Sequence, residues 1–223
     1  MDQYSVTLTG VTPLLLHADN LAFSEKVKAW QKDPANRELS HAGDDRSPAW
    51  TWIGSVYHDG RVVGIDSDNI MTMLREGGAK VKTGKGKDTY KKQTQSGLML
   101  DQALWPIATS IYPGGVPVAK LNALIGVNDF SEHLEIAEAC GFELLVKRAR
   151  IGMAKNIRVR PMFRAWTAAG SITVMDSELS GLTQPILQTI LTQAGIMCGL
   201  GDWRPSSNKS GTFGKFMATV EKL

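Results

Sequence analysis

The feature that most constrains this chain is a cluster of glycines near its C-terminus. Two short stretches form it: CGLGDWRP, residues 198–205, and GTFGKF, residues 211–216. Glycine lacks a Cβ, so such a segment lets backbone N–H groups approach a ligand or another chain closely and tolerates positive φ angles. Apolar residues at helical spacing over 182–194, with Gly195 placed to end the helix, precede the cluster, and an extended pattern over 212–221 follows it. We therefore expect a helix, a glycine loop and a closing strand.

Two familiar glycine motifs do not fit this sequence. A dinucleotide-binding G-x-G-x-x-G would need a third glycine where Arg204 stands, and no strand leads directly into the cluster. A P-loop would need Ser or Thr after Gly84 and Lys85, where Gly86 follows instead. Two interpretations of the glycine cluster therefore remain: a loop that contacts a ligand, and an ordinary helix-to-strand connection with extra glycines.

The composition is that of a globular domain. The chain has 223 residues with 43% hydrophobic content, and no apolar run is long enough to span a bilayer. Its first residues lack the pattern of a signal peptide, and two cysteines with four scattered histidines offer no metal-ligand spacing. We expect a cytoplasmic protein with no metal, no other cofactor and no membrane partner.

The positive charge is concentrated in two segments. Residues 75–92 carry seven Lys or Arg against two acidic residues, and residues 147–164 carry seven against none. The net charge of the whole chain is only +3, so the remainder is acidic. Segregation by sign is typical of a protein that binds a polyanion at a defined place, and solvated basic loops are the alternative.

Hydrophobic periodicity and turn residues predict an α+β chain. The polar segment 32–48 has almost no apolar residue and is expected to be a surface insertion or an arm that packs only on a partner. Residues 97–118 look extended, and the glycine- and lysine-rich residues 77–92 are expected to form a mobile basic loop. The predicted elements are strands at 3–9, 142–146, 163–174 and 212–221, helices at 23–30, 68–76, 131–139 and 182–194, and a hairpin of 50–57 with 61–65.

Without its insertions, this order is a ferredoxin-like, split βαβ core. We expect one domain over residues 1–223, with an arm inserted at 18–50 and the basic loop and a middle region inserted at 77–160. The C-terminal glycine-rich loop completes the expected fold.

Two blocks of sequence make a family resemblance visible. The glycine loop, GLG at 199–201 through GTFGKF, resembles the C-terminal glycine-rich loop of the RAMP superfamily of CRISPR-associated proteins. Residues 65–75, IDSDNIMTMLR, are similar to the strand, turn and helix motif of that superfamily's backbone subunits, which ends in Arg. The two blocks cover roughly 35 of the 223 residues and occur in the expected order.

The resemblance implies an RNA-recognition-like fold that polymerises along a guide RNA and holds its phosphates with basic residues. It implies contacts at the end of the first helix, in the basic loop and in the glycine loop, and the charge pattern adds the second basic segment. The candidate RNA-binding residues are Asn69, Met73, Arg75, Lys80, Lys82, Lys85, Lys87, Tyr90, Lys91, Lys92, Arg148, Arg150, Arg158, Arg160, Gly199, Gly201, Arg204, Gly211, Gly214 and Lys215.

The function expected from these features is non-catalytic binding of single-stranded RNA by a homo-oligomeric filament, as in a CRISPR-type antiviral effector with other subunits. The bound strand is single-stranded RNA, which could be a guide RNA, or single-stranded DNA. A RAMP-like endoribonuclease with His17 or His58 as general base is one alternative, although the histidines lie in four unrelated segments. A single-strand-binding or structural assembly protein of a phage or mobile element is another.

Overall fold

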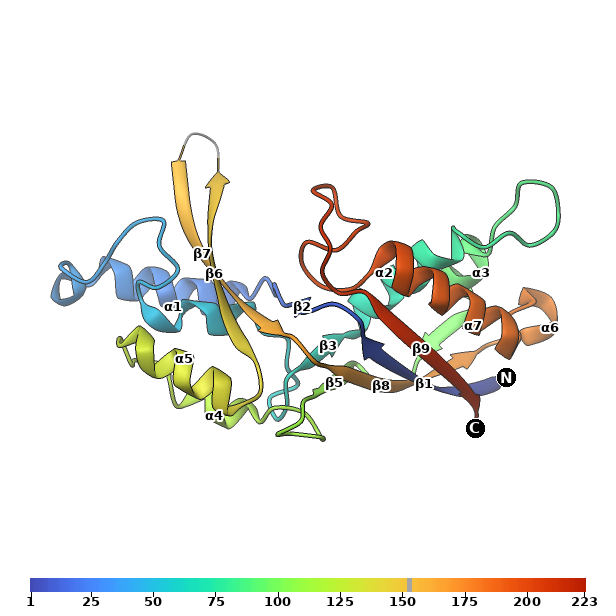
Figure 1. Ribbon diagram of the computed structural model, residues 1–223, viewed down its shortest axis with the longest axis horizontal. Coiled ribbons are helices and arrows are strands. Elements are labelled where there is room, and N and C mark those ends of the chain that lie inside the picture. Colours follow the sequence, from blue (N-terminus) through green and yellow to red (C-terminus); the bar gives the residue numbers. More distant parts are fainter. Residues whose placement is uncertain (152–153) are drawn as a thin grey trace.

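The computed structural model describes residues 1–151 and 154–223, so Gly152 and Met153 of the second basic segment lie outside the described residues. Its larger sheet has the strand order β3-β5-β8-β1-β9, with β4 also paired to β8 (Figure 1). All of these pairs are antiparallel. The strands are β1 (Asp2–Gly10), β3 (Gly64–Asp66), β4 (Leu98–Leu100), β5 (Leu104–Ala108), β8 (Thr167–Val174) and β9 (Phe216–Lys222).

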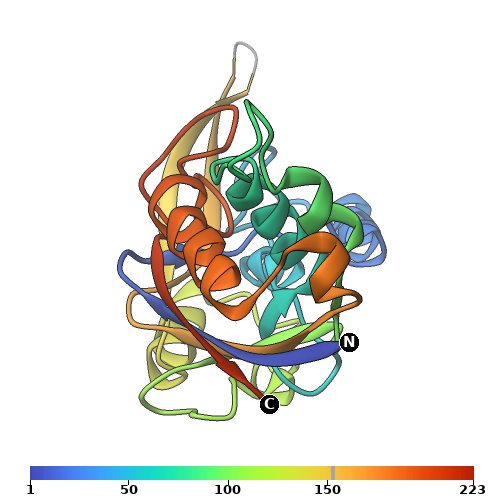
Figure 2. The same ribbon diagram turned by 90° about the vertical axis from the view of Figure 1, so that its right-hand side faces the viewer.

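One face of this sheet forms the main core. Val6 and Leu8 of β1 are fully buried, whereas Thr7 between them is exposed, as the alternation of the sequence predicts. Helices α2 (Ser67–Gly78) and α7 (Gln184–Gln193) cover the buried face (Figure 2). The predicted α+β class is confirmed in this coarse sense.

Local sequence signals account for α2 and for its place against α7. The Asp66 side chain caps α2 by accepting a hydrogen bond from the Asp68 amide at 2.8 Å. A side chain at Gly77 would collide with Ala194 and with the Ile190 carbonyl, so glycine permits the close approach of the two helices. The predicted helices at 68–76 and 182–194 are therefore present with small changes at their ends.

A smaller sheet lies at the other end of the molecule (Figure 1). Its order is β2-β7-β6, and β6 and β7 form a long basic hairpin that extends away from the body. The elements here are β2 (Leu14–Leu15), α1 (Leu21–Lys32), η1 (Pro34–Asn36), η2 (Ala49–Ser55), α4 (Val118–Asn122), α5 (Phe130–Ala139), β6 (Glu143–Ile151) and β7 (Ala154–Phe163). The predicted helices at 23–30 and 131–139 are confirmed as α1 and α5.

The predicted strand at 50–57 is wrong, because residues Ala49–Ser55 form the 3₁₀ helix η2. Trp50, Trp52 and Ile53 are all buried there, and burial on more than one side suits a helical turn better than a strand with one buried face. The turn expected between residues 57 and 61 of that hairpin is present, and a bridge between His58 and Val63 closes it.

Other parts of the predicted element order also need correction. The strand expected at 163–174 is interrupted after Phe163, because Trp166 turns inward and donates a hydrogen bond to the Thr12 carbonyl at 3.0 Å. Gly195 does not end α7, because the chain continues through a π-helical turn, η3 (Ala194–Cys198), to Gly199 at φ 70°. The basic loop predicted over residues 77–92 ends earlier, because Lys91 begins the short helix α3 (Lys91–Ser96). Helix α6 (Ser177–Ser180) has no counterpart among the predicted elements.

The polar segment 32–48 packs on its own chain, so of the two alternatives predicted for it, a surface insertion fits and an arm that packs only on a partner is wrong. Asp44 forms a bridge with Ile157 of β7, and the Asp45 amide donates to the Ile157 carbonyl at 3.0 Å. Asp45 and Ser47 are both buried. Across the described residues, no helix has the length and apolar character needed to cross a membrane.

Candidate nucleic-acid interface

Three segments that are distant in sequence extend from the same side of the molecule (Figures 1 and 2). They are the basic hairpin of β6 and β7, the glycine loop at residues 199–215 and the basic loop at residues 77–92. Both views place the two loops and the adjoining ends of β6 and β7 on the side of the molecule away from the open face of the larger sheet. The fold therefore brings the two basic segments of the sequence to one side.

The basic loop is an exposed turn held by few contacts. A bridge between Lys82 and Thr89 closes it, and the Thr83 amide donates to the Asp88 carbonyl at 2.9 Å. Within the described part of the chain, no ion pair engages its cationic side chains. The exposed cations of the loop and its edge are Arg75, Lys80, Lys82, Lys85, Lys87, Lys91 and Lys92.

A groove of about 570 Å³ separates the end of α2 from the glycine loop. Arg75, Lys80 and Lys91 line it together with Cys198 and Ser206. Glu76 lies there too. Its carboxylate accepts a hydrogen bond from the Ser206 hydroxyl at 2.6 Å and forms an ion pair with the Arg204 guanidinium at 3.4 Å. Because its one acidic group is paired, the groove presents net positive charge.

The glycines of the glycine loop serve close packing within the chain. A Cβ at Gly201 would collide with the Leu15 carbonyl, and one at Gly214 would collide with the Leu200 backbone. Both have positive φ, at 75° and 70°. The Gly214 amide donates to the Pro13 carbonyl at 2.8 Å, so these glycines fasten the loop to β2 instead of presenting amides to a ligand.

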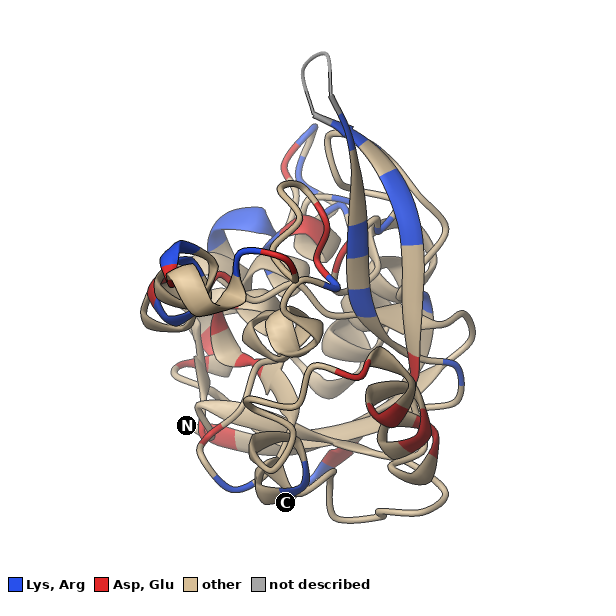
Figure 3. Ribbon diagram, turned by 90° about the vertical axis from the view of Figure 1, so that its left-hand side faces the viewer, with Lys and Arg blue, Asp and Glu red and all other residues tan. Residues whose placement is uncertain are grey.

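The basic hairpin carries exposed cations along β6 (Figure 3). Arg148 and Arg150 are exposed, and Lys147 places its ammonium nitrogen 4.6 Å from the centre of the Trp203 ring. This contact joins the hairpin to the glycine loop, since 56 positions separate the two residues in sequence. A strand bound along this side would meet both segments together.

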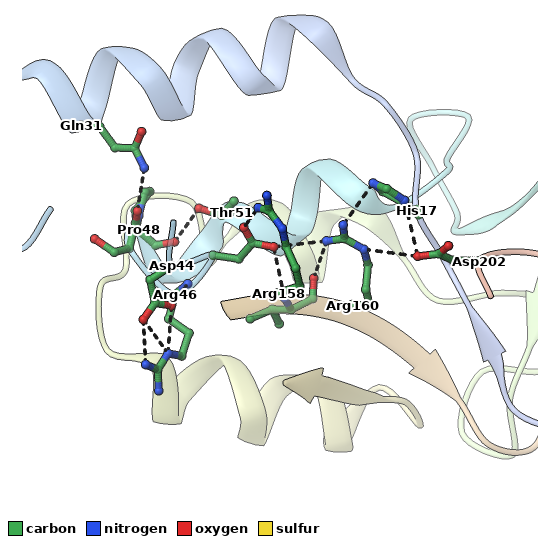
Figure 4. Close-up of polar contacts among 12 residues, drawn as sticks. His17, Gln31, Asp44, Arg46, Pro48, Thr51, Arg158, Arg160 and Asp202 are labelled. Carbon is green, nitrogen blue, oxygen red and sulfur yellow. Dashed lines mark hydrogen bonds and ion pairs between the residues drawn. The ribbon is translucent and has the colours of Figure 1, made fainter. Parts of the chain in front are cut away.

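Two cations of the hairpin are committed to their own chain (Figure 4). Asp45, which is 7% exposed, accepts from Arg158 Nη1 at 2.5 Å and from Arg160 Nη1 at 3.2 Å. Arg160 also lies 3.7 Å from Asp202 of the glycine loop through Nε. These guanidinium groups are therefore structural ties between the arm, β7 and the glycine loop, and their charge is balanced locally.

His17 completes this network. Arg160 Nη2 lies 3.1 Å from His17 Nε2, and guanidinium groups only donate, so Nε2 must accept and Nδ1 must carry the hydrogen. His17 Nδ1 faces the Asp202 carboxylate at 3.4 Å. Burial favours the neutral form of Asp202, but the hydrogen bond from His17 and the charge of Arg160 hold the pKa of Asp202 below its usual value.

The candidate RNA-binding residues do not form one continuous site. Arg75, Lys80 and Lys91 line the groove, Arg204 contacts its Glu76, and Lys82, Lys85, Lys87, Tyr90 and Lys92 belong to the basic loop. Met73 is 1% exposed and belongs to the core, so its side chain is not at the surface. Asn69 on α2, Gly211 and Lys215 are half-buried, Gly199 and Gly214 are buried, and Arg158 and Arg160 are paired with Asp45.

Sequence reasoning missed Lys147 and Trp203 as partners. Trp203 is the one tryptophan inside the glycine-rich polar stretch, and that isolation from any apolar pattern was the available signal. The contact with Lys147 had no local signal, because it depends on how the hairpin and the glycine loop meet in the folded chain.

No protein-family model matches the sequence, and no curated protein matches it. The function of this interface is therefore inferred from its own residues alone.

Proposed function

We propose that this protein binds single-stranded RNA without cleaving it and assembles along the strand as a homo-oligomer. The observation that supports this most is the gathering of the basic hairpin, the glycine loop and the basic loop on one side of the molecule (Figures 1 and 2). Unpaired lysines on exposed turns suit the phosphates of a flexible strand, and contacts to phosphates carry no sequence information. Binding should therefore depend strongly on salt and weakly on sequence.

The topology supports a RAMP-type, ferredoxin-like core. Helix α2 directly follows β3 and leads through α3 to β4, which pairs with β8, and α7 connects β8 to β9 across β1. Each helix thus joins strands that do not pair with each other, as expected of a split βαβ arrangement. Residues 65–75, similar to the motif of backbone subunits, form the end of β3 and most of α2. A guide RNA, other effector subunits and a cytoplasmic location belong to this proposal.

Self-association is supported by the edge of the larger sheet. β9 is an edge strand in which Met217 is 65% exposed, and Ile196 beside α7 is 56% exposed. Unpaired strand edges with apolar side chains are common places of contact between chains. Light scattering with a saturating excess of long RNA should show multimers, and strict monomers under these conditions would rule out assembly along the strand.

The central experiment measures the salt dependence of binding to a labelled single-stranded RNA. If four to six phosphates per protomer are neutralised, log K should fall with log salt at a slope of about −3 to −4. Replacing Lys85, Lys87, Lys91 and Lys92 with Ala should weaken binding and make the slope shallower. A matched control replaces Lys26, Lys28, Lys32 and Arg37, four exposed cations of the arm. A flat salt response of the parent protein would refute the proposal.

The same preparation tests the alternatives. His133 is buried, and the lone pair of His17 Nε2 faces Arg160, so neither is placed as a general base. Metal-independent cleavage of the RNA that disappears in a His17→Asn, His58→Asn variant would instead establish an endoribonuclease. The ratio of absorbance at 260 and 280 nm separates a nucleic-acid-binding protein from a structural assembly protein, and competition between RNA and DNA strands decides which strand is preferred.

A further inference from the structure

Trp203 has an unusual backbone conformation for its residue type. Its φ is 49°, and it is the one residue other than glycine with positive φ in the described part of the chain. A bulky side chain in the left-handed region is strained, and such strain persists where surrounding contacts fix it, often at functional positions. Here the Trp203 amide donates to Asp202 Oδ1 at 2.9 Å, and the Trp203 carbonyl accepts from the Phe213 amide at 3.4 Å. The loop thus holds this side chain in a fixed place.

The conformation keeps the indole ring out of the core. Trp50, Trp52, Trp105 and Trp166 are each at most 4% exposed, whereas Trp203 is only half-buried. Its neighbours are the Phe213 ring, with centroids 6.2 Å apart and planes at 47°, and the Lys147 ammonium above the ring. A ring that is partly accessible, fixed by its backbone and flanked by a second ring is suited to stacking.

Positive charge at the ring comes from Lys147. Its ammonium lies over the ring, whereas Arg148 and Arg150 project from the opposite face of β6, because successive side chains of a strand alternate between its faces. Single-stranded nucleic acids bind where stacking rings alternate with cations, because each nucleotide offers a flat base and a phosphate. A base on the Trp203 ring would take the position of the Lys147 ammonium, whose long side chain can then pair with the adjacent phosphate.

We propose that Trp203, supported by Phe213 and flanked by Lys147, is the stacking site for an unpaired nucleobase of the bound strand. This inference rests on the proposed binding of single-stranded RNA and adds a base contact to the phosphate contacts described above. The site takes any base, because stacking uses the face of the base and not its hydrogen-bonding edge. Purines bind it more tightly than pyrimidines because their stacking surface is larger.

The test compares two short strands of equal charge, hexa-adenylate and an abasic hexamer with the same number of phosphates. The parent protein should bind hexa-adenylate at least fivefold more tightly, within the range measured for single stacked bases. Trp203→Asn should bind both strands equally, because Asn tolerates the left-handed backbone but offers no ring. Trp203→Phe should keep the preference, which separates loss of stacking from loss of folding.

Tryptophan fluorescence of the unmodified protein gives a second readout. Stacking of adenine should quench the emission of Trp203, and this quenching should persist in Trp30→Ala, which removes the other half-buried tryptophan. Equal binding of both hexamers by the parent, or a preference that survives in Trp203→Asn, would overturn the inference while leaving the proposed function intact. If the parent binds neither strand, the proposed function itself fails.

Discussion

Asp45 of the arm and Arg160 of β7 are joined across the chain by a hydrogen-bonded ion pair of 3.2 Å, and the Asp45 side chain is 8% exposed. The same carboxylate accepts from Arg158 at 2.5 Å and from the Val159 amide at 3.2 Å. The polar segment 32–48, which has almost no apolar residue of its own, is thus held to β7 by this carboxylate as well as by the backbone hydrogen bonds of residues 43–45 with Ile157. The geometry of the hairpin depends on this buried acid.

Replacing Asp45 with Ala should lower the free energy of unfolding by about 2 to 3 kcal/mol, because two guanidinium groups and a buried amide lose their acceptor. The matched control is Asp44→Ala, whose side-chain bonds reach only Arg46 two residues away and should contribute below about 1 kcal/mol. Urea denaturation of both variants measures the difference. An equal loss of unfolding free energy in the two variants would show that the hydrogen bonds of Asp45 stabilise the fold no more than those of Asp44.

His133 should make stability depend on pH. Trp52 Nε1 donates to His133 Nδ1 at 3.1 Å, and His133 Nε2 therefore donates to the Val127 carbonyl at 3.0 Å. Burial lowers the pKa of His133 below 6.5, so the unfolded chain binds a proton more readily than the folded chain. The free energy of unfolding should accordingly decrease as pH falls below about 6.5.

The variant His133→Asn tests this assignment. It should be less stable than the parent at pH 8, but it should lose less stability between pH 7.5 and pH 5. Urea titrations across this range supply the two profiles. Parallel profiles for parent and variant would assign the pH dependence to other groups.

Trp203→Gly should leave the free energy of unfolding within about 1 kcal/mol of the parent. The left-handed backbone costs a residue with a Cβ about 1 to 2 kcal/mol, which glycine recovers, and this offsets the lost contacts with Phe213 and Lys147. Trp166→Gly serves as the comparison, because that ring is 3% exposed and its removal should cost about 3 to 5 kcal/mol. A large loss in Trp203→Gly would make Trp203 a structural residue.

Gly201→Ala should destabilise the protein by more than about 2 kcal/mol. The added methyl group would meet the Leu15 carbonyl, and the backbone at φ 75° disfavours any Cβ. Gly84→Ala in the basic loop is the control, since φ there is 82° but no atom lies within 4 Å. A thermal melt should show a much larger shift for Gly201→Ala, and similar shifts would mean that the glycine loop adapts.

Trypsin should cut the free protein first after Lys82, Lys85 or Lys87. These lysines are exposed, and repulsion among neighbouring cations weakens a turn that few hydrogen bonds hold. Bound RNA should slow these cuts more than cuts at Lys26 or Lys28 on α1. Peptide mapping at short digestion times identifies the sites, and equal protection of both regions would argue against RNA binding at the basic loop.

Much of the larger sheet and its helices could be predicted from the sequence. The alternation that buries Val6 and Leu8 and the helical spacing of Ile70 and Leu74 are local patterns that need no distant partner. The Asp66 cap and the Asp-Gly turn are likewise local chemistry. The sequence also located both basic segments, since charge can be counted along the chain.

Only the tertiary structure decided how those segments are used. It placed Arg158 and Arg160 against Asp45, more than 110 residues away in sequence. The positive charge of these two residues is therefore balanced within the chain. It buried Met73 and set Lys147 over Trp203. The physical reason is that the sequence determines which side chains carry charge or can stack, whereas pairing and exposure depend on which distant backbone segments the folded chain brings together.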